Sequence, residues 1–306
     1  MKQLSLLCLL VLVPLLSGFD TATRSIPLDE IMAGGPPKDG IPALTNPKFV
    51  SAKNADFVKK DDRILGLFIN GEAKAYPINI MNWHEIVNDT VGGKKVMVSY
   101  CPLCGTGMAF DPRIKGKLYT FGVSGLLYKS DMLMYDHETE SLWSQIKQEA
   151  VTGKLTGTRL KMLNLSHTTW EGWRKKHPKT LVLSTDTGYT RNYFRDPYTA
   201  YAGSDQLMFP VGEVDDRYPT KAWVLGVTRS GKSKAYPFLE LKNAPTRFKD
   251  KIGSEEIEIV YEPEFKTTHV FDKNGKEIPT LIAYWFAWTA FHPETAVYTA
   301  PPPKKP

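Results

Sequence analysis

One pattern in this sequence constrains the fold more than any other, because three groups of residues occur twice. The first group is Leu65-Gly66, Gly71 and Lys74-Ala75-Tyr76-Pro77, found again 160 positions later as Leu225-Gly226, Gly231 and Lys234-Ala235-Tyr236-Pro237. The second is Tyr100, Pro102, Phe110 and Asp111, found again 161 positions later as Tyr261, Pro263, Phe271 and Asp272. The third is Trp170, Trp173, His177-Pro178 and Thr180, found again 115 positions later as Trp285, Trp288, His292-Pro293 and Thr295. Self-similarity of this kind indicates an internal duplication. The shorter third spacing indicates that the first copy carries about 46 extra residues.

The segments around the repeated residues have the pattern of strands joined by tight turns. Asn70-Gly71 separates two largely apolar runs, and Asn-Gly in this position is the strongest short-range signal of a β-hairpin. A second turn is expected at Gly92-Gly93. We therefore expect a mainly β (α+β) fold in which two homologous β-rich halves, the products of an internal duplication, pack together with a few short helices.

The N-terminus predicts export. After Met1-Lys2-Gln3 an apolar run extends from Leu4 to Leu16, well short of the roughly 20 residues needed to span a bilayer, and this is typical of a secretory signal peptide. We expect a periplasmic or secreted protein without a membrane span once the signal is removed. The expected organisation is a signal peptide at 1–22, a Pro/Gly-rich lead-in at 23–63, a first repeat half at 64–200, a second at 201–298 and a disordered tail at 299–306.

The most distinctive local motif is Cys101-Pro102-Leu103-Cys104-Gly105, which directly follows an alternating strand. That strand places Val96, Val98 and Tyr100 on one face and Met97, Ser99 and Cys101 on the other. Proline fixes one backbone angle of the turn and glycine permits a positive φ after the second sulfur, so both thiols can face one point. This is the shape of a metal-binding knuckle. The same spacing can also close into a strained, reducible disulfide.

Comparison of the two copies separates the residues that the fold requires from those found in the first copy alone. Glu262 and Phe265 stand where the first copy has Cys101 and Cys104, so the fold does not require the thiols. The extra segment, 122–145, occurs in the same copy as the thiols, which suggests that thiols and segment form one site. The candidate ligands of a soft metal ion, Cu(I) or Zn(II), are Cys101, Cys104, His137, Met132, Met134 and Met108. Asp111 and His84 are further candidates by residue type, and we expect both to be structural.

Three stretches of this region resemble a known family. They are Tyr-Cys-Pro-Leu-Cys-Gly-Thr-Gly from Tyr100, Phe-Gly-Val-Ser-Gly-Leu-Leu-Tyr from Phe121, and Met-Tyr-Asp-His-Glu-Thr-Glu-Ser-Leu-Trp-Ser-Gln from Met134. In this order they resemble exported bacterial and archaeal proteins known as domain of unknown function 3179. The resemblance covers roughly 64–298 and implies an exported, mainly β protein. It supplies no catalytic residues, so the chemistry must be argued from the residues themselves.

Several function classes are excluded by the sequence. The stretch from Gly226 to Ser233 fits the phosphate-loop pattern, but such a loop must open a helix, and Pro237 predicts turn and strand; we expect no nucleotide. Gly122-Val123-Ser124-Gly125 is followed by Leu126 and lacks the last glycine of a serine-hydrolase elbow. The net charge of +6 is spread among nearly as many acidic as basic residues, so we expect no nucleic-acid partner.

Three interpretations of the cysteine pair stay open. The first is thiolate binding of a metal ion. The second is thiol–disulfide exchange with a partner protein, with Cys101 as the attacking thiol. The third is a binding or structural module with a structural disulfide, although so short a disulfide loop stabilises little. Thioredoxin folds place Cys-x-x-Cys at the start of a helix, whereas the residues after Cys104 here predict a strand, which weakens the second interpretation.

Overall fold

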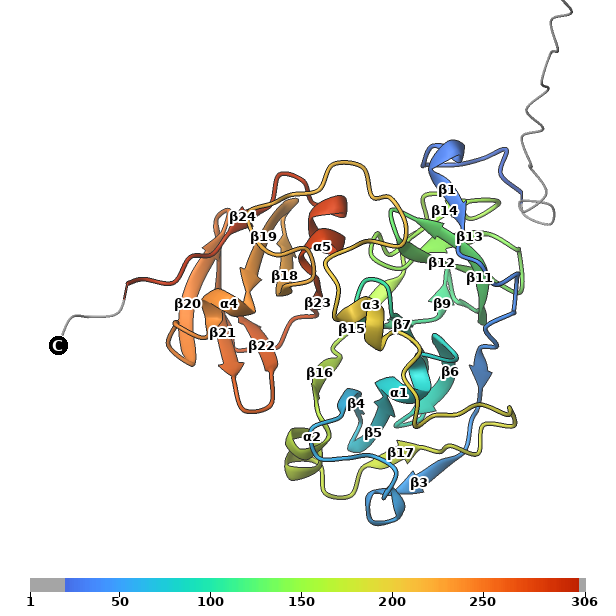
Figure 1. Cartoon of the computed structure of the whole chain (residues 1–306), viewed down its shortest axis with the longest axis horizontal. Helices are drawn as coiled ribbons and strands as arrows, with labels where there is room; N and C mark the ends of the chain where they lie inside the picture. The colour runs from blue at the N-terminus through green and yellow to red at the C-terminus, as the bar shows by residue number, and fades with distance from the viewer. Residues whose placement is uncertain (1–19, 303–306) are drawn as a thin grey trace, which may run out of the picture.

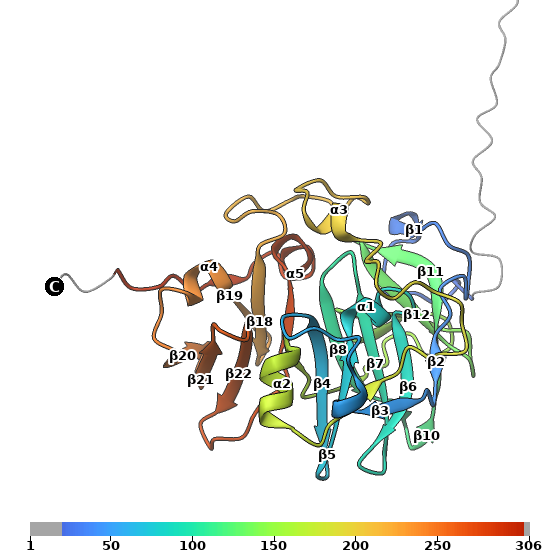
Figure 2. The ribbon, with the colours of Figure 1, turned by 60° about the horizontal axis from the view of Figure 1, so that its bottom comes forward.

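The computed structural model describes residues 20–302 and is nearly all β. Five sheets are arranged as a five-bladed β-propeller. Figures 1 and 2 show the strands of the last quarter of the chain on one side of the molecule and the earlier strands on the other. The predicted signal peptide, 1–22, falls almost wholly outside the described residues, as do the last four residues of the predicted tail.

Three sheets come from the first two thirds of the chain, and each has five strands. In hydrogen-bonded order, sheet 1 contains β1 (Ile31–Ala33), β11 (Phe121–Tyr128), β12 (Asp131–Asp136), β13 (Leu142–Ser144) and β14 (Glu149–Thr152). Sheet 2 contains β15 (Lys161–Leu163), β8 (Thr106–Asp111), β7 (Lys94–Cys101), β6 (Ile86–Val91) and β2 (Leu44–Thr45). Sheet 3 contains β16 (Ser166–Thr169), β4 (Arg63–Ile69), β5 (Glu72–Pro77), β17 (Leu181–Leu183) and β3 (Phe49–Ser51).

The remaining strands and the short helices complete the fold. Sheet 4 contains β23 (Leu281–Tyr284), β18 (Trp223–Arg229), β19 (Lys232–Pro237) and β24 (Ala296–Val297), and sheet 5 contains β20 (Arg247–Ile252), β21 (Glu255–Glu262) and β22 (Thr267–Asp272). β9 (Arg113–Ile114) and β10 (Lys117–Leu118) pair separately. The helices are α1 (Ile78–Met81), α2 (Trp170–Lys176), α3 (Thr199–Ala202), α4 (Phe238–Leu241) and α5 (Trp285–Phe291). None of the helices in residues 20–302 has the length and the apolar character that spanning a bilayer requires.

The expected fold class, two β-rich halves packed together, is wrong. The extra segment of the first copy is not an appendage of one half, because β11, β12 and β13 pair with one another and build most of sheet 1. The predicted lead-in, 23–63, also contributes a strand to this sheet, because β1 pairs with β11. Sheet 1 is therefore a blade of its own, and the five sheets form separate blades rather than two packed bodies.

The tight turns occur where the sequence predicts them. Asn70 and Gly71 have φ of 49° and 85° and join β4 to β5. Gly92 and Gly93 also have positive φ and join β6 to β7. The phosphate-loop match is a hairpin between β18 and β19, followed by strand rather than helix until Pro237. The predicted turn and strand are therefore confirmed.

Residues of the repeat make equivalent contacts. The Trp173 indole donates to Thr180 Oγ1 at 2.9 Å, and the Trp288 indole donates to Thr295 Oγ1 at 2.9 Å. A Cβ added to Gly66 would lie 2.4 Å from the Trp173 ring, which explains why this strand position has no side chain. The same holds for Gly226 against Trp288. These packing demands account for the recurrence of the residues, whereas the duplication itself stays a prediction.

The two faces of β7 pack against different parts of the core. Val96, Val98 and Tyr100 belong to a cluster with the strands of sheet 3. Met97 and Cys101 belong to a second cluster, which includes side chains from sheet 1, β23 and α5. The alternation read from the sequence is thus confirmed, and it directs the first cysteine toward the space between sheets 1, 2 and 4.

Candidate metal centre

The cysteine turn is a tight connection between β7 and β8 that two other segments hold in place. Gly105 has φ +63°, and a Cβ there would lie 2.9 Å from the Trp223 ring and 3.0 Å from the Tyr284 ring. Glycine is therefore required both by conformation and by space. The Tyr284 N–H donates to the Cys104 carbonyl at 2.9 Å, and the Tyr201 hydroxyl donates to the Leu103 carbonyl at 3.0 Å.

A second turn brings a carboxylate to the sulfurs. Lys129 and Ser130, both with positive φ, join β11 to β12 and precede Asp131, the first residue of β12. The Ser130 carbonyl lies 3.3 Å from Cys104 Sγ and 3.8 Å from Cys101 Sγ. One ligand atom each from Cys101, Cys104 and Asp131 lie within 4.8 Å of one another, and this group could hold a metal ion. All three residues are buried, and both cysteines are free thiols.

The Asp131 carboxylate is only half satisfied by the protein. Its Oδ2 accepts hydrogen bonds from the Ser144 hydroxyl and the Ile146 N–H, each at 3.0 Å. Its Oδ1 is buried and has no hydrogen-bond partner among the described residues. A buried acceptor without a partner costs about 1–3 kcal/mol. An ion bound between this oxygen and the sulfurs would satisfy it.

Acidic groups accumulate at this point of the core. Burial raises the pKa of Asp131 to about 7. Burial, together with the neighbouring Asp131, raises the pKa of Glu85 to about 8. Burial also raises the pKa of the Cys104 thiol, and Cys101, Asp131 and Glu85 raise it further. These acidic groups raise one another's pKa values, and a metal cation would balance the charge of their ionised forms.

Tyrosines surround the thiols. Burial raises the pKa of three of them, Tyr198, Tyr201 and Tyr284, and nearby acidic groups raise it further. Cys101 contributes for Tyr198, both cysteines contribute for Tyr201, and Cys104 contributes for Tyr284. For Tyr284 the pKa reaches about 12. These rings help to keep water from the thiols, of which Cys101 is 1% exposed and Cys104 fully buried.

The structure brings together some of the predicted ligands and not others. Met108, Met132 and Met134 lie in the same buried cluster as both cysteines. His137 is exposed, follows the far end of β12 and hydrogen-bonds through Nδ1 with the Thr120 hydroxyl at 3.0 Å. Because a strand rises about 3.3 Å per residue, His137 lies roughly 20 Å along the chain from Asp131. It is not part of the group around the cysteines.

The residues expected to be structural have structural contacts. Both ring nitrogens of the fully buried His84 are engaged, Nδ1 with the Pro42 carbonyl at 2.8 Å and Nε2 with the Tyr193 hydroxyl at 2.6 Å. Asp111 accepts from the Arg113 N–H at 3.0 Å and so caps a turn, as expected. Asp272 does the same for the Asn274 N–H at 2.9 Å.

The sequence interpretation missed Asp131, Glu85 and the surrounding tyrosines. Asp131 lies inside the segment that the sequence assigned to the site, but a preference for soft ligands favoured the methionines and His137. The signal that could have found it is its place at the start of a strand, directly after the turn that faces the cysteines. For Glu85, which follows α1 and has φ 57°, the sequence offers no comparable signal.

Comparison with known proteins agrees with the motifs. No match was found among curated proteins or among solved structures. A family model described as "Protein of unknown function (DUF3179)" matches residues 38–295. That range contains the cysteine turn, Glu85, Asp131 and all three tyrosines. Since the match covers well over half of the sequence, the chain belongs to the DUF3179 family of proteins of unknown function.

Proposed function

We propose that this protein binds a metal ion through Cys101, Cys104 and Asp131. One observation carries the proposal: donor atoms from two separate turns converge within 4.8 Å in the core, and one of the carboxylate oxygens is buried without a hydrogen-bond partner. Two thiols and a carboxyl group, brought together by the fold, form a preorganised site. A metal cation would displace their protons and balance the charge of the two thiolates and the carboxylate.

The donor set favours Zn(II) over Cu(I). Zinc binds both thiolate and carboxylate, usually with four ligands, whereas Cu(I) prefers sulfur throughout. Two groups are candidates for a fourth ligand. One is the carboxylate of Glu85, which raises the pKa of Cys104. The other is the buried Oε1 of Gln145, which has no hydrogen-bond partner among the described residues. Cu(I) is our second choice, since three methionines share the cluster with the cysteines.

Thiol–disulfide exchange receives less support from the same geometry. Exchange needs an accessible thiolate, but both thiols are buried and the pKa of Cys104 is raised. A raised pKa disfavours the thiolate unless a cation stabilises it.

We place the proposed metal centre in the periplasm or outside the cell, on the strength of the apolar leader at the N-terminus.

The Asp131→Asn variant tests the ligand set. The substitution keeps the side chain's shape but removes its charge, so we expect Zn(II) affinity to fall about 100-fold, roughly 3 kcal/mol. Competition with a chromophoric chelator measures this affinity.

His137→Asn is the matched control, because this exposed imidazole also stands on the segment that supplies Asp131. We expect its Zn(II) affinity to match that of the wild type. If His137→Asn weakens binding and Asp131→Asn does not, the ligands are those read from the sequence and the proposed set is wrong.

A further inference from the structure

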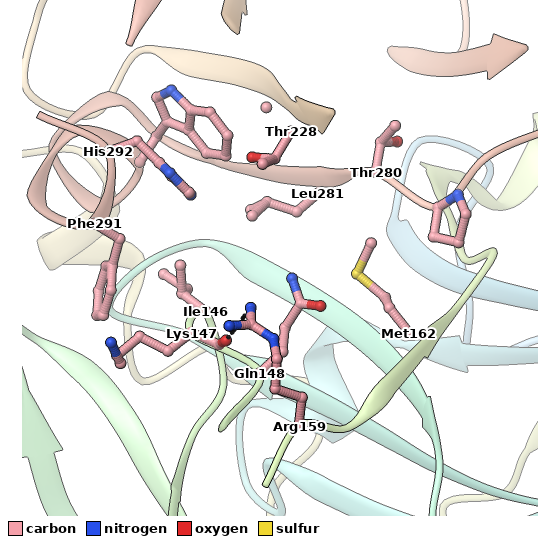
Figure 3. Close-up of a pocket in the computed structure, with 13 residues that line it drawn as sticks. Ile146, Lys147, Gln148, Arg159, Met162, Thr228, Thr280, Leu281, Phe291 and His292 are labelled. Carbon is pink, nitrogen blue, oxygen red and sulfur yellow. Dashed lines mark hydrogen bonds between the residues drawn. The ribbon is translucent and has the colours of Figure 1, made fainter. Parts of the chain in front are cut away.

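A cavity of about 390 Å³ lies between sheets 1 and 4, apart from the cysteines. Figure 3 shows Lys147, Gln148 and Arg159 on one side and Thr228, Leu281 and His292 on the other. Cavities of this size at the boundary between structural units are the usual sites for small organic ligands. Nothing in the proposed metal centre uses this one.

The cavity has an apolar wall. Its lining includes Leu281 from β23 and Trp288 and Phe291 from α5, faced by Ile146 and Met162 from the opposite side. Such a surface favours the apolar body of a ligand, at about 25 cal/mol for each Å² removed from water.

The charge at the mouth of the cavity is positive. The lining contains Lys147 and Arg159 and, among the described residues, no aspartate or glutamate. Arg159 pairs with Glu149 at 3.3 Å, but its side chain is 65% exposed, so this pair is weak. No hydrogen bond or ion pair of the Lys147 ammonium is found in residues 20–302. Burial lowers the pKa of His292 to about 4, so its imidazole is uncharged near neutral pH. The Nδ1 atom of this ring forms a hydrogen bond with the Ser233 hydroxyl.

We propose that this cavity binds a small organic carboxylate with an apolar body. The carboxylate lies against Lys147 and Arg159, and the apolar part lies against Leu281, Trp288 and Phe291. Arg159 is already held beside Lys147, because its Nη2 donates to the Lys147 carbonyl at 3.2 Å. The site is independent of the metal, although its wall residue Ile146 donates the backbone hydrogen bond to Asp131.

The test uses the full chain as purified and two probes of the same shape, 3-phenylpropionate and the neutral 3-phenyl-1-propanol, titrated by calorimetry and by saturation-transfer NMR. We expect the wild type to bind the carboxylate with a Kd below about 10 mM and the alcohol at least about fivefold more weakly. The variant Lys147→Gln with Arg159→Gln should bind the carboxylate about tenfold more weakly or worse. Lys94→Gln with Arg113→Gln removes two exposed cations elsewhere and should bind as the wild type does.

Thr228→Trp tests the place of binding. Thr228 is exposed and lines the cavity, so an indole there should fill the space and abolish binding. The proposal is overturned if the wild type binds neither probe, if the alcohol binds as well as the carboxylate, or if binding survives both the charge removal and Thr228→Trp. A failure of metal binding would leave these outcomes unchanged.

Discussion

Replacement of both Cys101 and Cys104 by serine is expected to weaken Zn(II) binding by about 10⁴-fold. Structural zinc sites bind with about 10–16 kcal/mol, so each of about four ligands contributes roughly 3 kcal/mol, and two thiolates contribute about 6 kcal/mol. Serine cannot replace them, because its hydroxyl stays protonated near neutral pH. Competition against a high-affinity chelator under anaerobic conditions measures the loss.

The same variant separates two of the interpretations of the cysteine pair, the metal centre and the structural disulfide. If the pair is a metal centre, Zn(II) raises the melting temperature of the wild type and not of the variant. If the pair were only a structural disulfide, the variant would lose stability while no metal effect would be seen in either protein. Met108→Leu, which changes a side chain in the same buried cluster at nearly constant volume, controls for disturbance of the core and should keep the metal effect.

The second large effect is expected at a buried ion pair of sheets 2 and 3. Lys74 Nζ lies 3.0 Å from both carboxylate oxygens of Asp89, and the Tyr76 hydroxyl donates to Asp89 Oδ2 at 2.8 Å. The charged side chains are only 9% and 5% exposed. Asp89→Ala would leave the buried ammonium with only the Thr90 carbonyl at 2.9 Å and the more exposed Glu72 carboxylate at 3.9 Å. We expect the free energy of unfolding to fall by about 3 kcal/mol. Urea denaturation followed by circular dichroism measures this change.

The repeat supplies the control for this experiment. Lys234, Tyr236 and Asp250 form the equivalent trio, with Lys234 and Asp250 at 2.6 Å and the Tyr236 hydroxyl donating to Asp250 at 2.9 Å. Here the charged side chains are 18% and 19% exposed, so water can reach the lysine when the carboxylate is removed. Asp250→Ala should therefore cost only about 1–2 kcal/mol. An equal or larger loss for Asp250→Ala would refute the dependence on burial.

Local features of the fold could be predicted because they depend on neighbouring residues. The Asn70-Gly71 turn needs two residues that accept positive φ, and the alternation along β7 follows from the period of a strand. The propeller could not be predicted in the same way. In sheet 3, β16 and β17 flank β4 and β5 although about 100 residues separate them in the chain, and no local pattern encodes such a pairing.

The candidate site was half predictable for the same reason. The cysteine turn is local, so the sequence located both thiols and the segment that reaches them. Which side chain of that segment faces the sulfurs depends on the turn at Lys129 and Ser130, whose positive φ values place Asp131 there and leave His137 at the exposed end of β12. Neither residue type is usual at positive φ, so the sequence did not mark this turn.

X-ray absorption spectroscopy of the anaerobically purified, zinc-loaded protein tests the central claim most directly. The proposed centre predicts one zinc per chain, with two sulfur neighbours at about 2.3 Å and oxygen neighbours at about 2.0–2.2 Å. In the Asp131→Asn variant the sulfur shell should persist while the oxygen shell changes. A zinc shell without sulfur, or a protein that retains no zinc or copper after loading, would contradict the account.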